Sequence, residues 1–189
     1  MPKLSAGLLL YRCLAGAVEV LLVHPGGPFW ARKDDGAWSI PKGEYEAAQD
    51  PLEHARREFA EELGTAAPSP GDYVALGHIK QAGGKLVSCW AVAGELDTTA
   101  IRSNTFELEW PRGSGRMQAF PEVDRADWFA LESARAKLLA SQVPFLDRLI
   151  ERLSELESGR AWWTTVLVSP APLTVRLPRP LTKFGNPPA

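Results

Sequence analysis

Three glutamates lie close together within residues 38–65, at spacings that place them on one side of a helix. Glu58, Glu61 and Glu62 follow the i, i+3, i+4 rule and share an arc of roughly 100°. Like charges at this spacing repel one another, and more strongly if they are buried. Arg57 offers one compensating charge, four residues before Glu61. A divalent cation is a stronger candidate, because clustered carboxylate oxygens bind Mg²⁺ or Mn²⁺. A solvated acidic face is the alternative interpretation.

The helix that carries these glutamates has clear start and stop signals. Asp50 is suited to the N-cap, Pro51 to the first helical position, and Glu53 to a capping box. Gly64 ends the helix, because glycine adopts the left-handed conformation at little cost. The pattern also predicts one apolar stripe that faces the core, formed by Leu52, Ala55, Phe59 and Leu63.

The order of residues around the glutamates resembles the signature of the Nudix (MutT-like) hydrolases. That signature reads Gly, five residues, Glu, seven residues, then Arg-Glu-apolar-x-Glu-Glu-x-Gly-apolar. Gly43 and residues 57–64 match it, and residues 38–43 look like the family's lead-in to the motif. The resemblance extends more weakly over residues 4–155. It implies a hydrolase that needs Mg²⁺ or Mn²⁺.

Two positions depart from the signature. Thr65 stands where the family prefers an aliphatic residue, and Gln49 stands where it has Glu. In the family this Glu mainly braces the motif loop against the arginine at the Arg57 position, so Gln49 and Arg57 are expected to give structural support. Glutamine still forms hydrogen bonds there, but without the assistance of a charge. The departure therefore bears on the rigidity of the loop more than on the chemistry.

The resemblance also implies roles for the acidic residues. Glu58 and Glu62 are expected to be the central metal ligands, together with the Gly43 carbonyl. Glu61 is expected to bind the metal or to orient another ligand. Many Nudix chains place one more Glu shortly before a Trp-apolar pair, and Glu122 occupies that place as a further ligand or the general base. Which glutamate is the base stays open, and Asp124 and Asp127 compete with Glu122.

The substrate class implied by the resemblance is a nucleoside diphosphate linked to another group, cleaved at the diphosphate. A dinucleoside polyphosphate or a nucleoside triphosphate is favoured. One alternative is a Nudix-fold sensor that binds a nucleotide without cleaving it, and a weaker one is a scaffold that docks through its C-terminal tail. The candidate substrate contacts combine cations and an aromatic ring, and they are Trp30, Arg32, Lys33, Lys42 and Lys85.

The apolar patterning predicts an α/β fold, which the resemblance specifies as an α/β/α sandwich with a mixed central sheet. The runs at 5–11 and 18–24 are apolar almost throughout, so both faces of the sheet should be covered by helices. These two runs are expected to form a first hairpin, and residues 73–80 and 85–94 a second one. Besides the motif helix, two further helices are expected over residues 131–139 and 142–156. Residues 97–117 are expected to form an irregular loop.

Composition limits the other function classes. The 189 residues carry a net charge of −2, so no global basic field indicates duplex nucleic acid. No apolar run is long enough for a membrane span or a signal peptide, and a cytoplasmic protein is expected, as a monomer or homodimer. We expect a Nudix domain over residues 1–158 and a weakly ordered, Pro-rich and basic extension over 159–189. His54 is expected on the exposed side of the motif helix.

Overall fold

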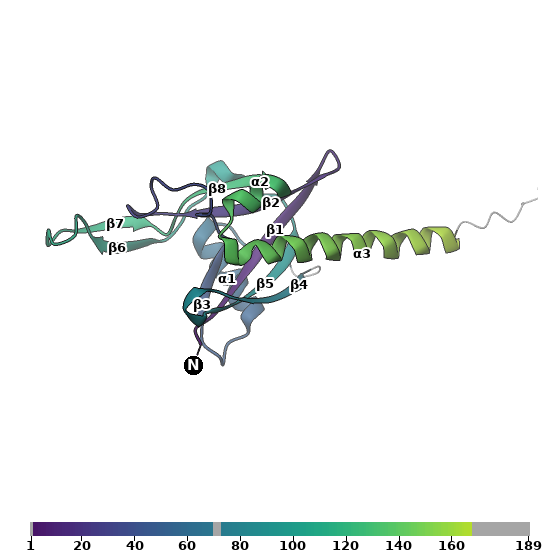
Figure 1. Ribbon diagram of the computed structural model, residues 1–189, viewed down its shortest axis with the longest axis horizontal. Coiled ribbons are helices and arrows are strands. Elements are labelled where there is room, and N and C mark those ends of the chain that lie inside the picture. Colours follow the sequence, from purple (N-terminus) through teal and green to yellow (C-terminus); the bar gives the residue numbers. More distant parts are fainter. Residues whose placement is uncertain (1, 70–72, 168–189) are drawn as a thin grey trace, which may run out of the picture. The chain divides into compact units, whose positions relative to one another are not determined.

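The structure is a computed structural model that describes residues 2–69 and 73–167, with side chains up to residue 156. The chain divides into two units, Met1–Ser154 and Glu155–Ala189. The strands (Figure 1) are β1 (Leu4–Leu14), β2 (Ala17–Pro25), β3 (Lys42–Tyr45), β4 (Val74–Lys80), β5 (Leu86–Ala93), β6 (Thr105–Glu109), β7 (Met117–Pro121) and β8 (Val123–Ala130). The helices are α1 (Pro51–Leu63), α2 (Leu131–Lys137) and α3 (Val143–Leu167), with short 3₁₀ turns η1 (Ala82–Gly84), η2 (Thr98–Ala100) and η3 (Ala140–Gln142).

The first unit is built on a mixed sheet, as the sequence predicted. Its strand order is β4-β5-β1-β2-β8, and the short strand β3 pairs with the start of β1. The β1–β5 pair is parallel, whereas the β1–β2, β1–β3, β2–β8 and β4–β5 pairs are antiparallel. Both predicted hairpins are confirmed, and the turn of the first uses Ala15 and Gly16 at positive φ. The pairing with β1 fixes β3, and with it the start of the motif.

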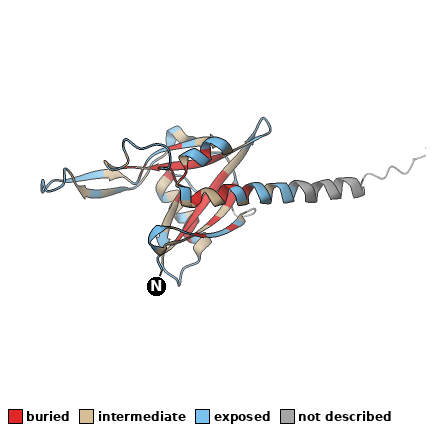
Figure 2. Cartoon of the chain, in the orientation of Figure 1, coloured by how far each residue is buried: buried red, intermediate tan, exposed pale blue. Residues whose placement is uncertain are grey.

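Helices cover both faces of this sheet, which explains the continuous apolar runs. Along β1, Leu8 and Leu10 pack on the side of α1, while Leu9 packs on the other side with α2 and α3. Phe59 of α1 and Phe145 of α3 are both fully buried, one in each layer. Figure 2 shows the buried residues concentrated in the central strands between these helices. The α/β/α sandwich is therefore confirmed.

The motif helix α1 begins and ends where the sequence predicted. The Asp50 side chain accepts from the N–H groups of Leu52 and Glu53, both at 2.9 Å, and Pro51 fills the first position. Gly64 ends the helix in the left-handed conformation, at φ 71°. The capping box does not form, because the Glu53 carboxylate pairs with Arg56 at 2.7 Å instead.

Two expectations for the second half of the chain were wrong. Residues 97–117, expected as an irregular loop, contain β6, which pairs with β7 in a separate two-stranded sheet. The helix expected to end before Gly159 continues through it to Leu167. A glycine inside a helix costs only about 1 kcal/mol, so it is a weak stop signal without a cap. The domain boundary after residue 158 stays a prediction, and residues 168–189 lie outside the described part of the chain. In that described part, no helix is long and apolar enough to cross a membrane.

Candidate active site

The Glu58 carboxylate lies directly against the backbone of Gly43. Strand β3 holds Gly43 opposite Ala6 of β1, and Ser5 Oγ donates a hydrogen bond of 2.8 Å to the Gly43 carbonyl. A Cβ atom at position 43 would lie 1.9 Å from Glu58 Cδ and 2.0 Å from Glu58 Oε2. Residue 43 must therefore be glycine if Glu58 is to reach this place. The Gly43 carbonyl keeps a second lone pair for another partner.

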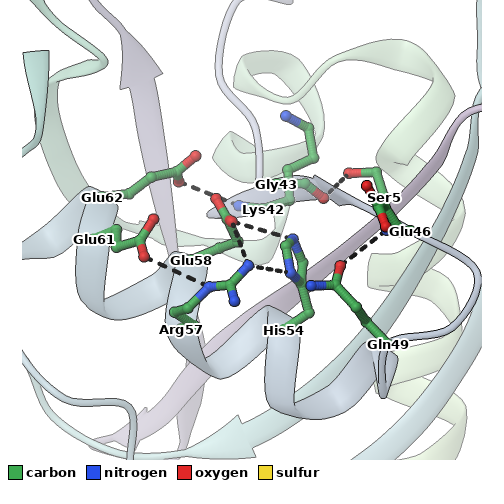
Figure 3. A network of polar contacts seen from close by, with 10 residues as sticks. All are labelled: Ser5, Lys42, Gly43, Glu46, Gln49, His54, Arg57, Glu58, Glu61 and Glu62. Atoms are coloured by element: carbon green, nitrogen blue, oxygen red, sulfur yellow. Dashed lines mark hydrogen bonds and ion pairs between the residues drawn. The ribbon is translucent and has the colours of Figure 1, made fainter.

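Glu62 lies beside Glu58 and accepts a backbone hydrogen bond. Lys42 N donates to Glu62 Oε2 at 3.2 Å, which joins the end of α1 to β3 (Figure 3). Burial raises the pKa of Glu62 to about 8, although Lys42 opposes the shift. Burial also raises the pKa of Glu58, and the negative charge of Glu61 adds to this. Without a cation, this partly buried place therefore disfavours the ionised form of both carboxylates.

Glu61 is more exposed than its two neighbours and faces Arg57. Arg57 Nε lies 3.5 Å from Glu61 Oε1, as the i, i+4 spacing predicts. The same guanidinium lies 3.9 Å from Glu58 Oε1. Arg57 therefore spans two of the three glutamates, although about half of its side chain is exposed and the charge of the cluster is only partly balanced.

Gln49 supports the loop through a different partner from the one expected. Its Oε1 atom accepts from the N–H of Glu46 at 2.9 Å. Among the residues that the structure describes, no hydrogen bond joins Gln49 to Arg57. Arg57 Nη2 instead lies 2.7 Å from Nδ1 of His54. A Gln side chain is therefore sufficient for the contact that residue 49 makes.

His54 was misplaced by the sequence analysis. It is only 4% exposed and lies between α1 and β3, where the Tyr45 ring is 5.5 Å away. Burial lowers the pKa of His54, and the charge of Arg57 lowers it further. The signal was present in the spacing, because His54 precedes Arg57 by three residues and Glu58 by four. The missing information was that β3 covers this side of the helix.

Glu122 is the residue between β7 and β8, so it approaches the glutamates of α1 from a different part of the chain. Its N–H donates to the Asn104 carbonyl at 2.8 Å, and its own carbonyl accepts from Gly26 N at 2.9 Å. Its negative charge contributes to the raised pKa values of both Glu58 and Glu62.

The two aspartates that compete with Glu122 are engaged elsewhere. Asp124 Oδ1 lies 2.7 Å from His24 Nδ1, and Asp127 Oδ1 accepts from the N–H of Trp128 at 2.8 Å. Of Glu122, Asp124 and Asp127, it is therefore Glu122 whose charge raises the pKa values of Glu58 and Glu62.

The donor set of this cluster suits a hard divalent cation. It consists of carboxylate oxygens and one backbone carbonyl, which Mg²⁺ and Mn²⁺ prefer. Among the side chains described in residues 2–69 and 73–156, no three from His, Cys, Asp or Glu already surround an ion position. The fit rests instead on the cradle at Gly43, which brings the Glu58 carboxylate onto the backbone, and on the adjacent Glu62.

The sequence profile described as the NUDIX domain matches residues 1–153. The chain belongs to the Nudix family. The matched residues include the loop and the helix α1 that carry the three glutamates. Nudix hydrolases generally use divalent cations such as Mg²⁺ or Mn²⁺. No curated protein sequence gives a match to the chain.

Solved structures of Nudix proteins share the fold. The NUDIX domain of Shewanella oneidensis NrtR, in complex with ADP ribose, gives a TM-score of 0.56 at 17% identity, covering 81% of this chain and 89% of that one. A binary complex of the C. elegans Ap4A hydrolase gives a TM-score of 0.53 at 23% identity, covering 81% of this chain and 98% of that one. A mutT/nudix family protein from Listeria innocua gives 0.53 at 15% identity, covering 82% and 96%. At these identities the likeness concerns the fold.

The candidate substrate contacts divide into two groups. Lys42 and Lys85 lie near the three glutamates. Burial lowers the pKa of Lys42, which is part of β3. Lys85 Nζ lies 2.5 Å from Oε1 of Glu44, which is also in β3. The Lys42 ammonium points away from the carboxylates, while its N–H faces Glu62 (Figure 3).

The second group belongs to the loop after β2. Lys33 Nζ lies 4.4 Å from the centre of the Trp30 ring, and Arg32 is exposed beside them. No contact among the described residues joins Trp30, Arg32 or Lys33 to the Nudix glutamates.

A cavity of about 370 Å³ lies elsewhere, beside the end of α1, and the residues that line it include Leu63, Thr65, Gly94 and Asp97. None of the three motif glutamates lines it. The site is assigned from its chemistry, because the carboxylates and the glycine cradle lie at β3 and not at this cavity.

Replacing Gly43 by Ala is expected to displace Glu58 and to reduce turnover by about 100-fold, because small misplacements of reacting groups have effects of this size. The added Cβ atom would overlap the Glu58 carboxylate, which is 1.9 Å away. The free energy of unfolding should fall by about 1–3 kcal/mol, as for other overpacked sites. Steady-state kinetics and thermal unfolding of the variant measure both effects. Wild-type turnover in Gly43→Ala would mean that Glu58 does not rest on Gly43 in the working enzyme.

Proposed function

We propose that this Nudix domain is a metal-dependent hydrolase that cleaves a diphosphate linkage in a nucleoside diphosphate derivative. The observation that supports the proposal best is the placement of Glu58 on the backbone of Gly43, with Glu62 bound to the next N–H of the same strand. Two partly buried carboxylates thus lie beside one carbonyl group, and Arg57 balances their negative charge only in part. A dinucleoside polyphosphate or a nucleoside triphosphate is the favoured substrate.

The chemistry needs the negative charge of the diphosphate to be neutralised, because its oxygens repel an attacking nucleophile. A bound Mg²⁺ or Mn²⁺ supplies that neutralisation and activates the attacking water. Glu58 and Glu62 would hold the cation with the Gly43 carbonyl, and Glu61 and Glu122 would complete or orient its ligands. The carboxylate least committed to metal takes the proton from water, and Glu61 and Glu122 are the two candidates, since both are exposed.

The cations beside the motif would bind the transferred group. Lys42 precedes Gly43 on β3 and Lys85 pairs with Glu44 of that strand, so both would add positive charge beside the carboxylates for phosphate oxygens. Trp30, with Lys33 above its ring, would offer an aromatic face and a cation to a base and a phosphate. Among the similar folds, one binds ADP ribose and another is an Ap4A hydrolase, and both names fit the proposed class of substrate.

Incubating the protein with Mg²⁺ and a panel of compounds tests this proposal. The panel should hold a nucleoside triphosphate, a dinucleoside polyphosphate, a nucleotide sugar and a phosphomonoester, with products followed by phosphorus NMR. Hydrolysis is expected for a diphosphate-containing compound, to be absent for the phosphomonoester, and to stop when EDTA is added. Turnover that persists in EDTA would contradict the proposal.

The alternative, a domain that binds a nucleotide without cleaving it, is favoured by Gln49, which replaces the family's Glu. Calorimetry on the same panel separates the two functions. Binding of a nucleotide with no product after prolonged incubation with Mg²⁺ and Mn²⁺ would establish the sensor. Turnover that is lost in Glu58→Gln would establish the enzyme.

A further inference from the structure

One buried polar side chain next to the cluster has no place in the chemistry described above. His54 lies in the middle of the contact between α1 and β3, and only 4% of it is exposed. Its ring reaches two residues of the Nudix motif, Arg57 on one side and Glu58 on the other (Figure 3). Because the buried imidazole contacts both side chains, we expect it to affect how both are held.

The contact with Arg57 determines which ring nitrogen carries the hydrogen. Arg57 Nη2 lies 2.7 Å from Nδ1 of His54. A guanidinium only donates hydrogen bonds, so Nδ1 must accept, and the single hydrogen of the neutral ring is on Nε2. The ring therefore receives a hydrogen bond from Arg57 and presents an N–H donor on its opposite side.

The nitrogen that carries this hydrogen lies beside Glu58. Nε2 of His54 lies 3.1 Å from Glu58 Oε1, which is close enough for a strong contact with an anion. The N–H on Nε2 and Glu58 Oε1 are not aligned for a hydrogen bond, so Nε2 is buried without a hydrogen-bond partner among the described residues. The ring therefore holds an unpaired donor atom 3.1 Å from a carboxylate whose position against Gly43 is already restricted.

We propose that His54 is a positioning residue of the Nudix site, which links Arg57 to Glu58 and orients the Glu58 carboxylate for the cation. The inference rests on the proposed function, because it assigns to His54 a role that acts through a metal ligand. A hydrogen-bond partner behind a ligating carboxylate fixes its orientation, and removing such a partner typically lowers metal affinity or activity by 10- to 100-fold. His54 would touch neither substrate nor cation.

The test compares His54→Ala with His54→Gln and His54→Asn. The Gln amide reaches the region of Nε2 and restores a donor to Glu58, whereas the shorter Asn reaches only the region of Nδ1. For His54→Ala we expect a Mn²⁺ dissociation constant raised about 10-fold or more, measured by paramagnetic resonance. The kcat should fall by a similar factor, while the KM measured at saturating Mn²⁺ should change by less than about twofold.

Rescue distinguishes positioning from a general effect on the fold. His54→Gln is expected to recover Mn²⁺ affinity to within about threefold of wild type, and His54→Asn to recover much less. Glu53→Gln is the matched control, because it removes the ion pair with Arg56 on the same helix without touching the cluster. It should leave Mn²⁺ affinity unchanged.

Two results would overturn the inference. One is wild-type Mn²⁺ affinity in His54→Ala. The other is an equal loss in all three His54 variants that follows their melting temperatures, which would make the histidine a packing residue only. These outcomes require a wild-type protein that binds Mn²⁺ and hydrolyses a diphosphate. A wild type that does neither would instead refute the proposed function, and the role of His54 with it.

Discussion

Replacing Glu58 or Glu62 by Gln is expected to lower turnover by about 100-fold or more, because each change removes a proposed ligand of the cation. The melting temperature should stay nearly unchanged or rise. Burial raises the pKa of both carboxylates, so the folded protein disfavours their ionised forms and should tolerate a neutral amide of the same shape. Loss of activity together with retained stability is the result that separates a functional carboxylate from a structural one.

Steady-state kinetics at saturating Mg²⁺ and thermal unfolding of the same preparations measure these two effects. Glu53→Gln is again the control, since Glu53 lies on α1 and pairs with Arg56 in an exposed position. Its turnover should be that of wild type. Full activity in Glu58→Gln or Glu62→Gln would remove the residue concerned from the proposed ligand set.

Without divalent cations, the protein is expected to lose stability as the pH rises from about 5 to about 9. Burial raises the pKa of Glu62 to about 8 from its ordinary value of 4.5. Between these values the folded state binds a proton that the unfolded state has released, so the free energy of unfolding falls as pH increases. The contribution of Glu62 is fully present below its unfolded pKa and is lost as the pH passes through the folded pKa.

Melting temperatures in EDTA at pH 6 and pH 9 measure this effect, which should amount to about 5 °C or more for a chain of this size. Adding Mg²⁺ at pH 9 should recover most of the loss, because the cation binds only the ionised carboxylates of the folded state. Glu62→Gln should show a flatter dependence on pH. An equal slope in wild type and Glu62→Gln would contradict the buried position of this carboxylate.

The sequence was most informative where one residue type answers one local requirement. Asp50, Pro51 and Gly64 set the ends of α1, and each does so through a contact or a backbone angle within that segment. The first hairpin was equally clear, because both faces of β1 and β2 are buried and the continuous apolar runs record that directly. These features depend on neighbours along the chain, so they are visible without the fold.

The parts that could not be predicted depend on contacts between distant segments. His54 looks exposed on a helical wheel, and only the pairing of β3 with β1 shows that strand β3 covers it. Gln49 could not be paired from the sequence, because its partner is the backbone of Glu46 within an irregular loop. The strand β6 alternates Phe106 and Leu108 with polar residues, but five residues inside a polar segment are a weak signal, and the pattern does not show that β7 is the partner.

The carboxylates held at Gly43 are proposed to bind the cation that hydrolysis needs. Titration with Mn²⁺, followed by the paramagnetic resonance signal of the free ion, tests this claim most directly on wild type and on a variant carrying both Glu58→Gln and Glu62→Gln. The wild type is expected to remove the free-ion signal in proportion to its concentration, and the double variant to leave it close to that of buffer. Equal removal of the signal by the two proteins would contradict the claim.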